Sequence, residues 1–241
     1  MKPNAYVLVS VFVCWLSACT DKLTPEMVIE KSLEKAHGGM VAWETPTRLV
    51  YEKTTTLYDS LQHVEIVKKQ TFHNTLQPIF TSTIRWVENG VEKHIVFDGK
   101  ATSVFSDNSQ ITDAVAIEAA YKEVMAAQYV LWQPYKLVAD EASLTNEGIF
   151  QLEDGSFAHK IKVVYPNSDT HWWYYFDTTT FLLKENLIQH SDGTYSQIIN
   201  ISQEEKTGLR LHKERKSFKI NATKDRKYLR AAYQYNILEL K

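Results

Sequence analysis

Alternating apolar and polar positions dominate the chain from Thr47 onward. Segments of about ten residues carry apolar or aromatic side chains at every second position, which is the spacing of β-strands with one buried face. They end at turn residues such as Asn89-Gly90, Asp154-Gly155 and Asp192-Gly193, which favour tight hairpins. The pattern therefore predicts about eleven strands joined into an antiparallel meander.

A helix is predicted before the first strand, over residues 25–37. Thr24 is a suitable N-cap, Pro25 occupies the first helical position, and Glu26 supplies an acidic side chain to the first turn. Gly38-Gly39 then provides the helix stop. The strands are therefore expected to follow one short amphipathic helix.

A second helix is predicted over residues 114–132, where the alternation breaks. The segment is apolar or aromatic except at a few positions, among them Glu118 and Lys122, which form an i,i+4 pair, and Pro134 ends it. A helix this apolar is expected to be buried over most of its circumference, while its charges argue against a membrane span. Because no linker or compositional break follows, residues 25–241 are predicted to form a single α+β, mainly β domain.

The segment HWWYYFD carries five aromatic side chains in succession. Because neighbouring side chains of a strand point to opposite faces, Trp172, Tyr174 and Phe176 are expected to face the interior of the sheet. Trp173 and Tyr175 must then be covered or left half exposed on the opposite face. A strongly curved sheet wrapped around the two helices accounts for this need, and its concave side has room for helices and a ligand.

The N-terminus has the pattern of a secretory signal peptide. A positive charge is followed by an apolar run over residues 6–16, which is shorter than the roughly 20 residues of a membrane-spanning helix. The run ends in Leu16-Ser17-Ala18-Cys19, which resembles the lipobox of bacterial lipoproteins. That resemblance implies that residues 1–18 are a signal peptide, that Cys19 is lipidated and that residues 19–24 form a tether. An uncleaved hydrophobic anchor is the alternative.

Cysteine content and charge exclude several classes of protein. Cys14 and Cys19 are the two cysteines and both belong to the N-terminal region, so no disulfide is expected in the folded part. The formal net charge is -2 without a basic block, which argues against a nucleic-acid partner. The nearest basic run, Lys213, Arg215 and Lys216, is predicted to be a solvated strand face.

The sequence contains no recognisable pattern of catalytic or metal-binding residues. None of the eight histidines lies in an HExxH or HxH spacing, so neither a metal nor another cofactor is predicted. His37-Gly38-Gly39 resembles the glycine-rich oxyanion loops of esterases, but no Gly-x-Ser-x-Gly motif follows and a helix stop explains it. Carboxylates such as Glu52, Asp98 and Glu185 are scattered and define no pair. We therefore expect a protein that is not an enzyme.

The second half of the chain resembles a known superfamily. The stretch WWYYFDTTTFLLKENL, followed by YSQIINISQEEKTGLRLHKERKSF, is similar to the C-terminal half of the outer-membrane lipoprotein carrier and receptor (LolA/LolB-like) superfamily. KAHGGMVAWETP and LWQPYKLV resemble a lipidated branch of it. The resemblance implies a strongly curved, unclosed antiparallel half-barrel with helices packed on its concave side. It also implies an apolar cavity between sheet and helices that binds acyl chains.

Residues expected to line this cavity come from the sheet and from the helix over residues 114–132, which would act as a mobile lid. An alkyl chain needs only a dry pocket with few polar groups. The predicted ligand-binding residues are Trp86, Tyr121, Val124, Met125, Ile161, Val163, Trp172, Tyr174, Phe176, Tyr233 and Tyr235; each of them could equally be ordinary core.

The predicted function is that of a membrane-anchored binding lipoprotein whose partners are lipid or lipoprotein acyl chains. Thr20, rather than an aspartate, follows Cys19, which favours a periplasm-facing location at the outer membrane, with the cell surface as an alternative. Two other functions stay open: a structural or interaction lipoprotein whose cavity is filled by its own helices, and a carbohydrate-binding protein or hydrolase that uses exposed aromatic side chains.

Overall fold

The computed structural model describes residues 23–139, 141–166 and 168–241, so the predicted signal peptide and the predicted lipidation site at Cys19 lie outside the described residues. The helices are α1 (Pro25–Ala36), α2 (Met40–Glu44), α3 (Ala114–Leu131) and α4 (Lys136–Ala139). The strands are β1 (Arg48–Tyr58), β2 (Val64–Thr75), β3 (Thr81–Glu88), β4 (Val91–Phe97), β5 (Thr102–Ser106), β6 (Ser109–Ile111), β7 (Ser143–Gln151), β8 (Phe157–Val164), β9 (His171–Asp177), β10 (Leu183–Gln189), β11 (Tyr195–Gln203), β12 (His212–Ile220) and β13 (Arg226–Leu240).

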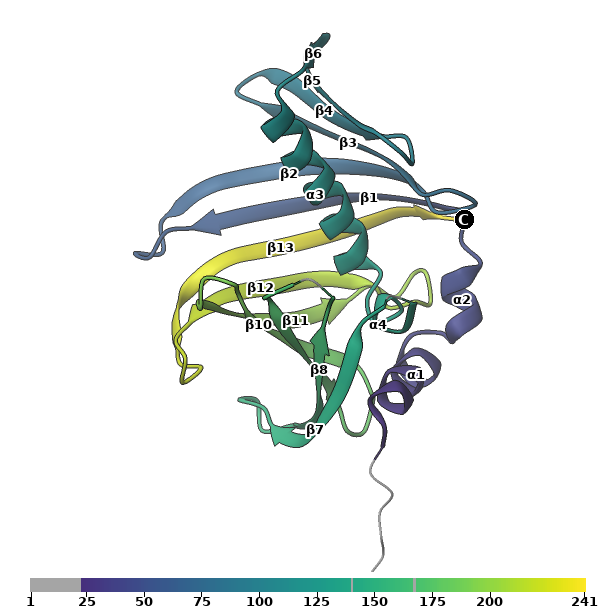
Figure 1. The fold of residues 1–241 in the computed structure, drawn as a ribbon, viewed down its shortest axis with the longest axis vertical. Helices are drawn as coiled ribbons and strands as arrows, with labels where there is room; N and C mark the ends of the chain where they lie inside the picture. Colours follow the sequence, from purple (N-terminus) through teal and green to yellow (C-terminus); the bar gives the residue numbers. More distant parts are fainter. Residues whose placement is uncertain (1–22, 140, 167) are drawn as a thin grey trace, which may run out of the picture.

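All thirteen strands of the described part form one sheet in the order β6-β5-β4-β3-β2-β1-β13-β12-β11-β10-β9-β8-β7. Every neighbouring pair is antiparallel, and the first strand, β1, pairs with the last, β13. The two strands that flank α3 and α4 in sequence, β6 and β7, are the two edges of the sheet, so it does not close into a barrel. The curved antiparallel half-barrel predicted from the sequence is confirmed (Figure 1).

Side-chain caps begin both α1 and α3, and the Thr24 cap of α1 is the one predicted from the sequence. The Thr24 hydroxyl accepts a hydrogen bond from the Met27 N–H at 3.2 Å, and the Asp113 carboxylate accepts one from the Ala116 N–H at 2.8 Å. The chain leaves α1 through Gly39, whose N–H donates to the Leu33 carbonyl at 2.9 Å. The helix-stop interpretation of the two glycines is therefore confirmed.

The shortest elements are the ones that the sequence pattern missed. α2 and α4 contain five and four residues, and β6 contains three, so none is long enough to repeat its hydrophobic period twice. The first half of β7 was also missed, because its alternating side chains are mostly small or polar. These elements depend on packing rather than on a local pattern.

The concave face of the sheet holds the main hydrophobic core, in which α1 packs against β7 and β9 and α3 contacts β4 and β5. Tyr174 and Phe176 of β9 are fully buried there, and Trp172 packs against the same core. A second, smaller cluster lies on the convex face and contains Tyr175, with Trp173 packed against it. The aromatic strand therefore meets an apolar cluster on each face, which explains its composition.

Helix α3 is less buried than its apolar sequence predicts. It crosses the concave side diagonally from the β5–β6 end toward α4 (Figure 1). Its buried residues are Ala120, Val124 and Leu131, while Val115 is 77% exposed. The expectation that most of its circumference is buried is therefore wrong. The helix bridges the open side of the half-barrel, and no second layer covers its outer surface in the described part of the chain.

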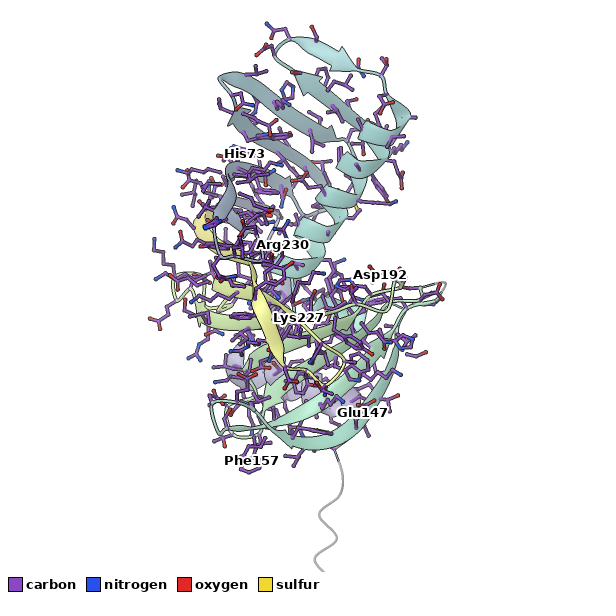
Figure 2. All side chains as sticks on the ribbon, turned by 90° about the vertical axis from the view of Figure 1, so that its left-hand side faces the viewer. His73, Glu147, Phe157, Asp192, Lys227 and Arg230 are labelled. Carbon is purple, nitrogen blue, oxygen red and sulfur yellow. The ribbon has the colours of Figure 1, made fainter. Side chains whose placement is uncertain are left out.

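Labelled residues in the side view of Figure 2 follow the order of their strands in the sheet. His73 on β2 lies toward one end of the domain, Arg230 and Lys227 on β13 lie near the middle, and Glu147 on β7 lies toward the other end. The sheet is therefore long in this direction, and α3 alone spans much of its open face. At about 1.5 Å per residue, an 18-residue helix reaches some 27 Å.

Candidate ligand-binding site

A cavity of about 520 Å³ lies between the C-terminal half of α3 and the segment that joins β8 to β9. Its volume is within the range of pockets that hold small organic ligands, about 300–1,000 Å³. Apolar and aromatic side chains dominate its wall, with a few polar groups at one side. The lining residues are Met125, Ala126, Gln128, Tyr129, Val130, Lys136, Tyr165, Ser168, Thr170 and Trp172.

A network of tyrosine hydroxyls fixes α3 to the sheet at this cavity. The Tyr129 hydroxyl is hydrogen-bonded to that of Tyr165 and lies 3.3 Å from that of Tyr174. The Gln133 amide donates to the Tyr174 hydroxyl at 3.2 Å. Burial raises the pKa of Tyr129 far above its usual value, so its hydroxyl stays protonated. The apolar cavity thus has a group of hydrogen-bonded polar side chains at one side.

A second, more enclosed cavity of about 170 Å³ lies under the other side of α3. It shares Ala126 and Val130 with the first cavity, so the two cavities adjoin at these side chains of α3. Its other walls come from β1, β11, β12 and β13. The lining residues are Tyr51, Lys53, Glu123, Ala126, Ala127, Val130, Ile198, Arg215, Tyr233 and Tyr235.

The prediction that the Lys213, Arg215 and Lys216 run is a solvated strand face is wrong for its central member. Arg215 is only 3% exposed, and its side chain lies on the concave side. Its Nε donates to Asn200 Oδ1 at 2.7 Å, and its Nη2 donates to Asn186 Oδ1 at 3.1 Å. Strand alternation places Arg215 on the face opposite Lys216, and curvature makes that face the interior.

The structure brings four of the predicted ligand-binding residues to the two cavities. Met125 and Trp172 line the larger one, and Tyr233 and Tyr235 line the smaller one. That these residues bind a ligand stays a prediction. Tyr129, which sequence reasoning missed, lies four positions after Met125 and therefore on the same face of α3, so helical periodicity could have found it.

The other seven predicted residues do not line either of these cavities. Five are buried in the main core, where they pack against other side chains. Trp86 is half-buried beneath Lys68, whose Nζ lies 4.2 Å from its ring centre, and Tyr121 is 41% exposed. The five core residues are Val124, Ile161, Val163, Tyr174 and Phe176.

Two histidines near the end of α1 are buried in the protein interior. His37 is 2% exposed and its Nδ1 donates to the Leu209 carbonyl at 2.8 Å. Burial lowers the pKa of His37 to about 4, and burial also lowers that of the neighbouring His212 well below its usual value. Among the residues that the structure describes, no group of three or more His, Cys, Asp or Glu side chains is arranged to hold a metal.

Solved structures with the same architecture cover most of the chain. A LolA superfamily protein from Nitrosomonas europaea is 8% identical, with a TM-score of 0.56 over 91% of this chain and 94% of that one. A DUF1329 family protein from Desulfovibrio piger is 10% identical, with a TM-score of 0.57 over 90% and 92%. The protein has a LolA-like fold.

A third solved structure agrees with this assignment. It is an outer membrane lipoprotein-sorting protein domain from Vibrio parahaemolyticus, which is 6% identical, with a TM-score of 0.52 over 90% of this chain and 91% of that one. At these identities the likeness concerns the LolA-like fold and not the ligand. No protein-family model and no curated protein matches the sequence. In the part of the chain that the structure describes, no helix has the length and apolar character needed to cross a membrane.

Proposed function

We propose that the protein is a non-enzymatic binding protein that holds an acyl chain of a lipid or lipoprotein between α3 and the concave face of its sheet. The observation that carries the proposal is the cavity of about 520 Å³ beside α3, with Met125, Val130 and Trp172 in its wall. An acyl chain gains roughly 0.8 kcal/mol for each CH₂ group that leaves water. Such a wall therefore suffices to bind it without any catalytic group.

The relation between α3 and the sheet supports this function. Because the helix bridges an open face, a small displacement of α3 would admit a chain without unfolding the core. The two cavities adjoin at Ala126 and Val130, so a displacement of α3 at these residues would let a long ligand extend from one cavity into the other. The solved lipoprotein-sorting domain shares this architecture, which is consistent with acyl-chain binding.

The proposal includes attachment to a membrane. Lipidation of Cys19 would hold the domain close to a lipid surface through a short tether, because the first described residue, Leu23, follows only four positions later. Its carbonyl accepts a hydrogen bond from the Asn146 amide of β7 at 2.7 Å, so Leu23 lies beside β7. A periplasm-facing location at the outer membrane fits such an anchored binding protein.

The test is photo-crosslinking of the full chain in its host membranes with a fatty acid that carries a photoreactive group in its tail. Peptides that contain Met125 or Trp172 are expected to carry the label. Ala126→Trp, which places a large ring where the two cavities meet, is expected to reduce labelling at least fivefold.

Ala119→Trp is the matched control, because Ala119 is another exposed alanine on α3 that lines neither cavity. It is expected to leave labelling unchanged. Labelling that is absent, or spread over the surface and equally insensitive to both variants, would contradict the proposed function.

A further inference from the structure

The concave interior contains a buried positive charge without a counter-charge. Arg215 is 97% removed from solvent, and an arginine side chain stays protonated at any physiological pH. Its two hydrogen-bond acceptors, Asn200 and Asn186, are neutral amides. Among the described residues no carboxylate lies within ion-pair distance of it. A buried, unpaired charge costs several kcal/mol, so its presence calls for a compensating partner.

The nearest acidic group on the cavity wall is engaged elsewhere. Glu123 of α3 accepts hydrogen bonds from Gln70 at 2.7 Å and from Lys68 at 3.2 Å, both on β2. A second cation, Lys53, also lines the cavity, and its Nζ lies 5.4 Å from the ring centre of Tyr233. The wall of the smaller cavity therefore carries two cations and one carboxylate that is already paired.

Tyr51 lines the same cavity, and its hydroxyl is buried without a hydrogen-bond partner among the described residues. Its ring is fixed by stacking on Phe72, with 4.4 Å between ring centres. Burial, with a contribution from Tyr235 and Glu123, raises the pKa of Tyr51 well above its usual value. The group therefore keeps its proton and can donate a hydrogen bond, and leaving it unpaired in a buried position is unfavourable.

We propose that the smaller cavity is an anion-binding subsite, in which Arg215 and Tyr51 bind the carboxylate or phosphate head group of the ligand while its acyl tail lies in the larger cavity. The inference rests on the proposed function and deepens it: the ligand is an anionic amphiphile. Guanidinium Nη1 makes no hydrogen bond to a described residue, and it is the donor that matches a carboxylate or phosphate oxygen. The Tyr51 hydroxyl supplies a second donor.

The alternative explanation is that Arg215 is a brace that links β10, β11 and β12 through the two asparagines. A brace accounts for Nε and Nη2. It accounts neither for the uncompensated charge nor for the unpaired Tyr51 hydroxyl on β1, which takes no part in those bonds. The two orphaned donors come from separate strands and share one cavity, and that coincidence distinguishes a binding site from a structural link.

The test compares three probes on the full chain: a photoreactive fatty acid, the fatty alcohol with the same tail, and inorganic phosphate as a competitor. The wild-type protein is expected to be half-labelled at a concentration of the acid about tenfold lower than that of the alcohol, since a charge-assisted hydrogen bond is stronger than a neutral one. Inorganic phosphate is expected to compete with the acid only weakly, because it lacks the tail.

Arg215→Gln is expected to bring the acid and the alcohol to the same half-labelling concentration while the alcohol still binds. Tyr51→Phe keeps the ring and its stacking on Phe72, so it is expected to fold normally. It should weaken binding of the acid more than binding of the alcohol, because a hydrogen bond to a charged group is the stronger one. It decides the matter if Arg215→Gln fails to fold.

The outcomes separate the two proposals. Equal binding of acid and alcohol by the wild-type protein, or a preference that survives in Tyr51→Phe and Arg215→Gln, would overturn the anion subsite and leave acyl-chain binding intact. Failure of both probes to label the protein would overturn the proposed function itself. Strong competition by inorganic phosphate would show a site for small anions and would overturn the assignment to an amphiphile.

Discussion

The hydroxyl groups of Tyr129 and Tyr174 lie 3.3 Å apart and connect α3 to β9 beside the larger cavity. Tyr165, in the segment that joins β8 to β9, is connected to them through Tyr129, so one helical side chain contacts both β9 and the segment that precedes it. This contact holds the C-terminal half of the helix in place, whereas the outer surface of α3 carries exposed apolar residues such as Val115. The helix is thus fixed at one end of a site that it also covers.

Tyr129→Phe tests this attachment. The substitution keeps the ring and removes the hydroxyl, so we expect the free energy of unfolding to fall by about 1–2 kcal/mol, the contribution of one or two hydrogen bonds. Amide hydrogen exchange in the C-terminal half of α3 should become faster, while exchange in β1 and β13 should not change. Tyr121→Phe is the control, because the Tyr121 hydroxyl makes no hydrogen bond with a described residue. Equal effects of the two variants would show that the network does not hold the helix.

Gly38 marks a close approach between the end of α1 and the β11–β12 connection. It has a φ of +78°, and a Cβ at this position would lie 2.8 Å from the Gly208 carbonyl oxygen. Gly90 in the β3–β4 hairpin has a similar φ of +80°, but nothing lies within 4 Å of its Cβ position. In both Gly→Ala variants, backbone strain should lower the free energy of unfolding by about 1–2 kcal/mol.

Gly38→Ala is expected to lose at least about 1 kcal/mol more than Gly90→Ala, because the added methyl group meets rigid backbone. Chemical denaturation of the two variants side by side measures the difference. If they are equally destabilised, the approach of α1 to the β11–β12 connection is looser than the structure indicates.

The buried histidines predict an acid-sensitive stability. His37 has a pKa of about 4 in the folded state and about 6.5 when unfolded, so the unfolded chain binds more protons between these values. The stabilisation that comes from keeping His37 neutral is therefore complete above pH 6.5 and is lost as the pH falls toward 4. His212 acts in the same direction. We expect the free energy of unfolding to decrease from pH 7 to pH 5, where few carboxylates titrate.

His212→Leu isolates one of these groups, since both of its ring nitrogens are buried without a hydrogen-bond partner among the described residues. In this variant the free energy of unfolding should depend less steeply on pH. The slope should be smaller by up to about 1.4 kcal/mol per pH unit, the value for one proton. At pH 8, where both histidines are neutral, its stability should be close to that of the wild type. Denaturation curves at pH 5, 6, 7 and 8 provide the measurement, and an unchanged slope would contradict the burial argument.

The convex cluster is expected to contribute to stability and not to binding. Tyr175 is 6% exposed and packs there with Leu187 and Ile220, on the face opposite the two cavities. Tyr175→Ala should lower the free energy of unfolding by about 3–5 kcal/mol, as for other large aromatic truncations. Labelling by the photoreactive fatty acid should be unchanged under conditions where the variant is folded. A loss of labelling that exceeds the unfolded fraction would place the ligand on the convex face and contradict this prediction.

The local sequence pattern was sufficient to predict the elements that are long enough to repeat their hydrophobic period. Thr24 and Gly38-Gly39 delimit α1, and Asn89-Gly90 separates β3 from β4, because capping and turn geometry depend on a few neighbouring residues. The alternation within each long strand and the resemblance to the LolA/LolB-like superfamily indicated the half-barrel. The one-turn helices α2 and α4 carry no such pattern and could not be predicted.

The sequence by itself determined the strand meander, the two capped helices and the need for an apolar environment on both sides of Trp172 to Phe176. Only the tertiary structure decided which face becomes the interior, that α3 bridges an open side with much of its surface exposed, and that Arg215 lies buried beneath it. The reason is that alternation assigns side chains to two faces but does not say which one the curvature encloses. Whether a cation meets water or a dry cavity depends on that curvature and on contacts between strands far apart in the chain.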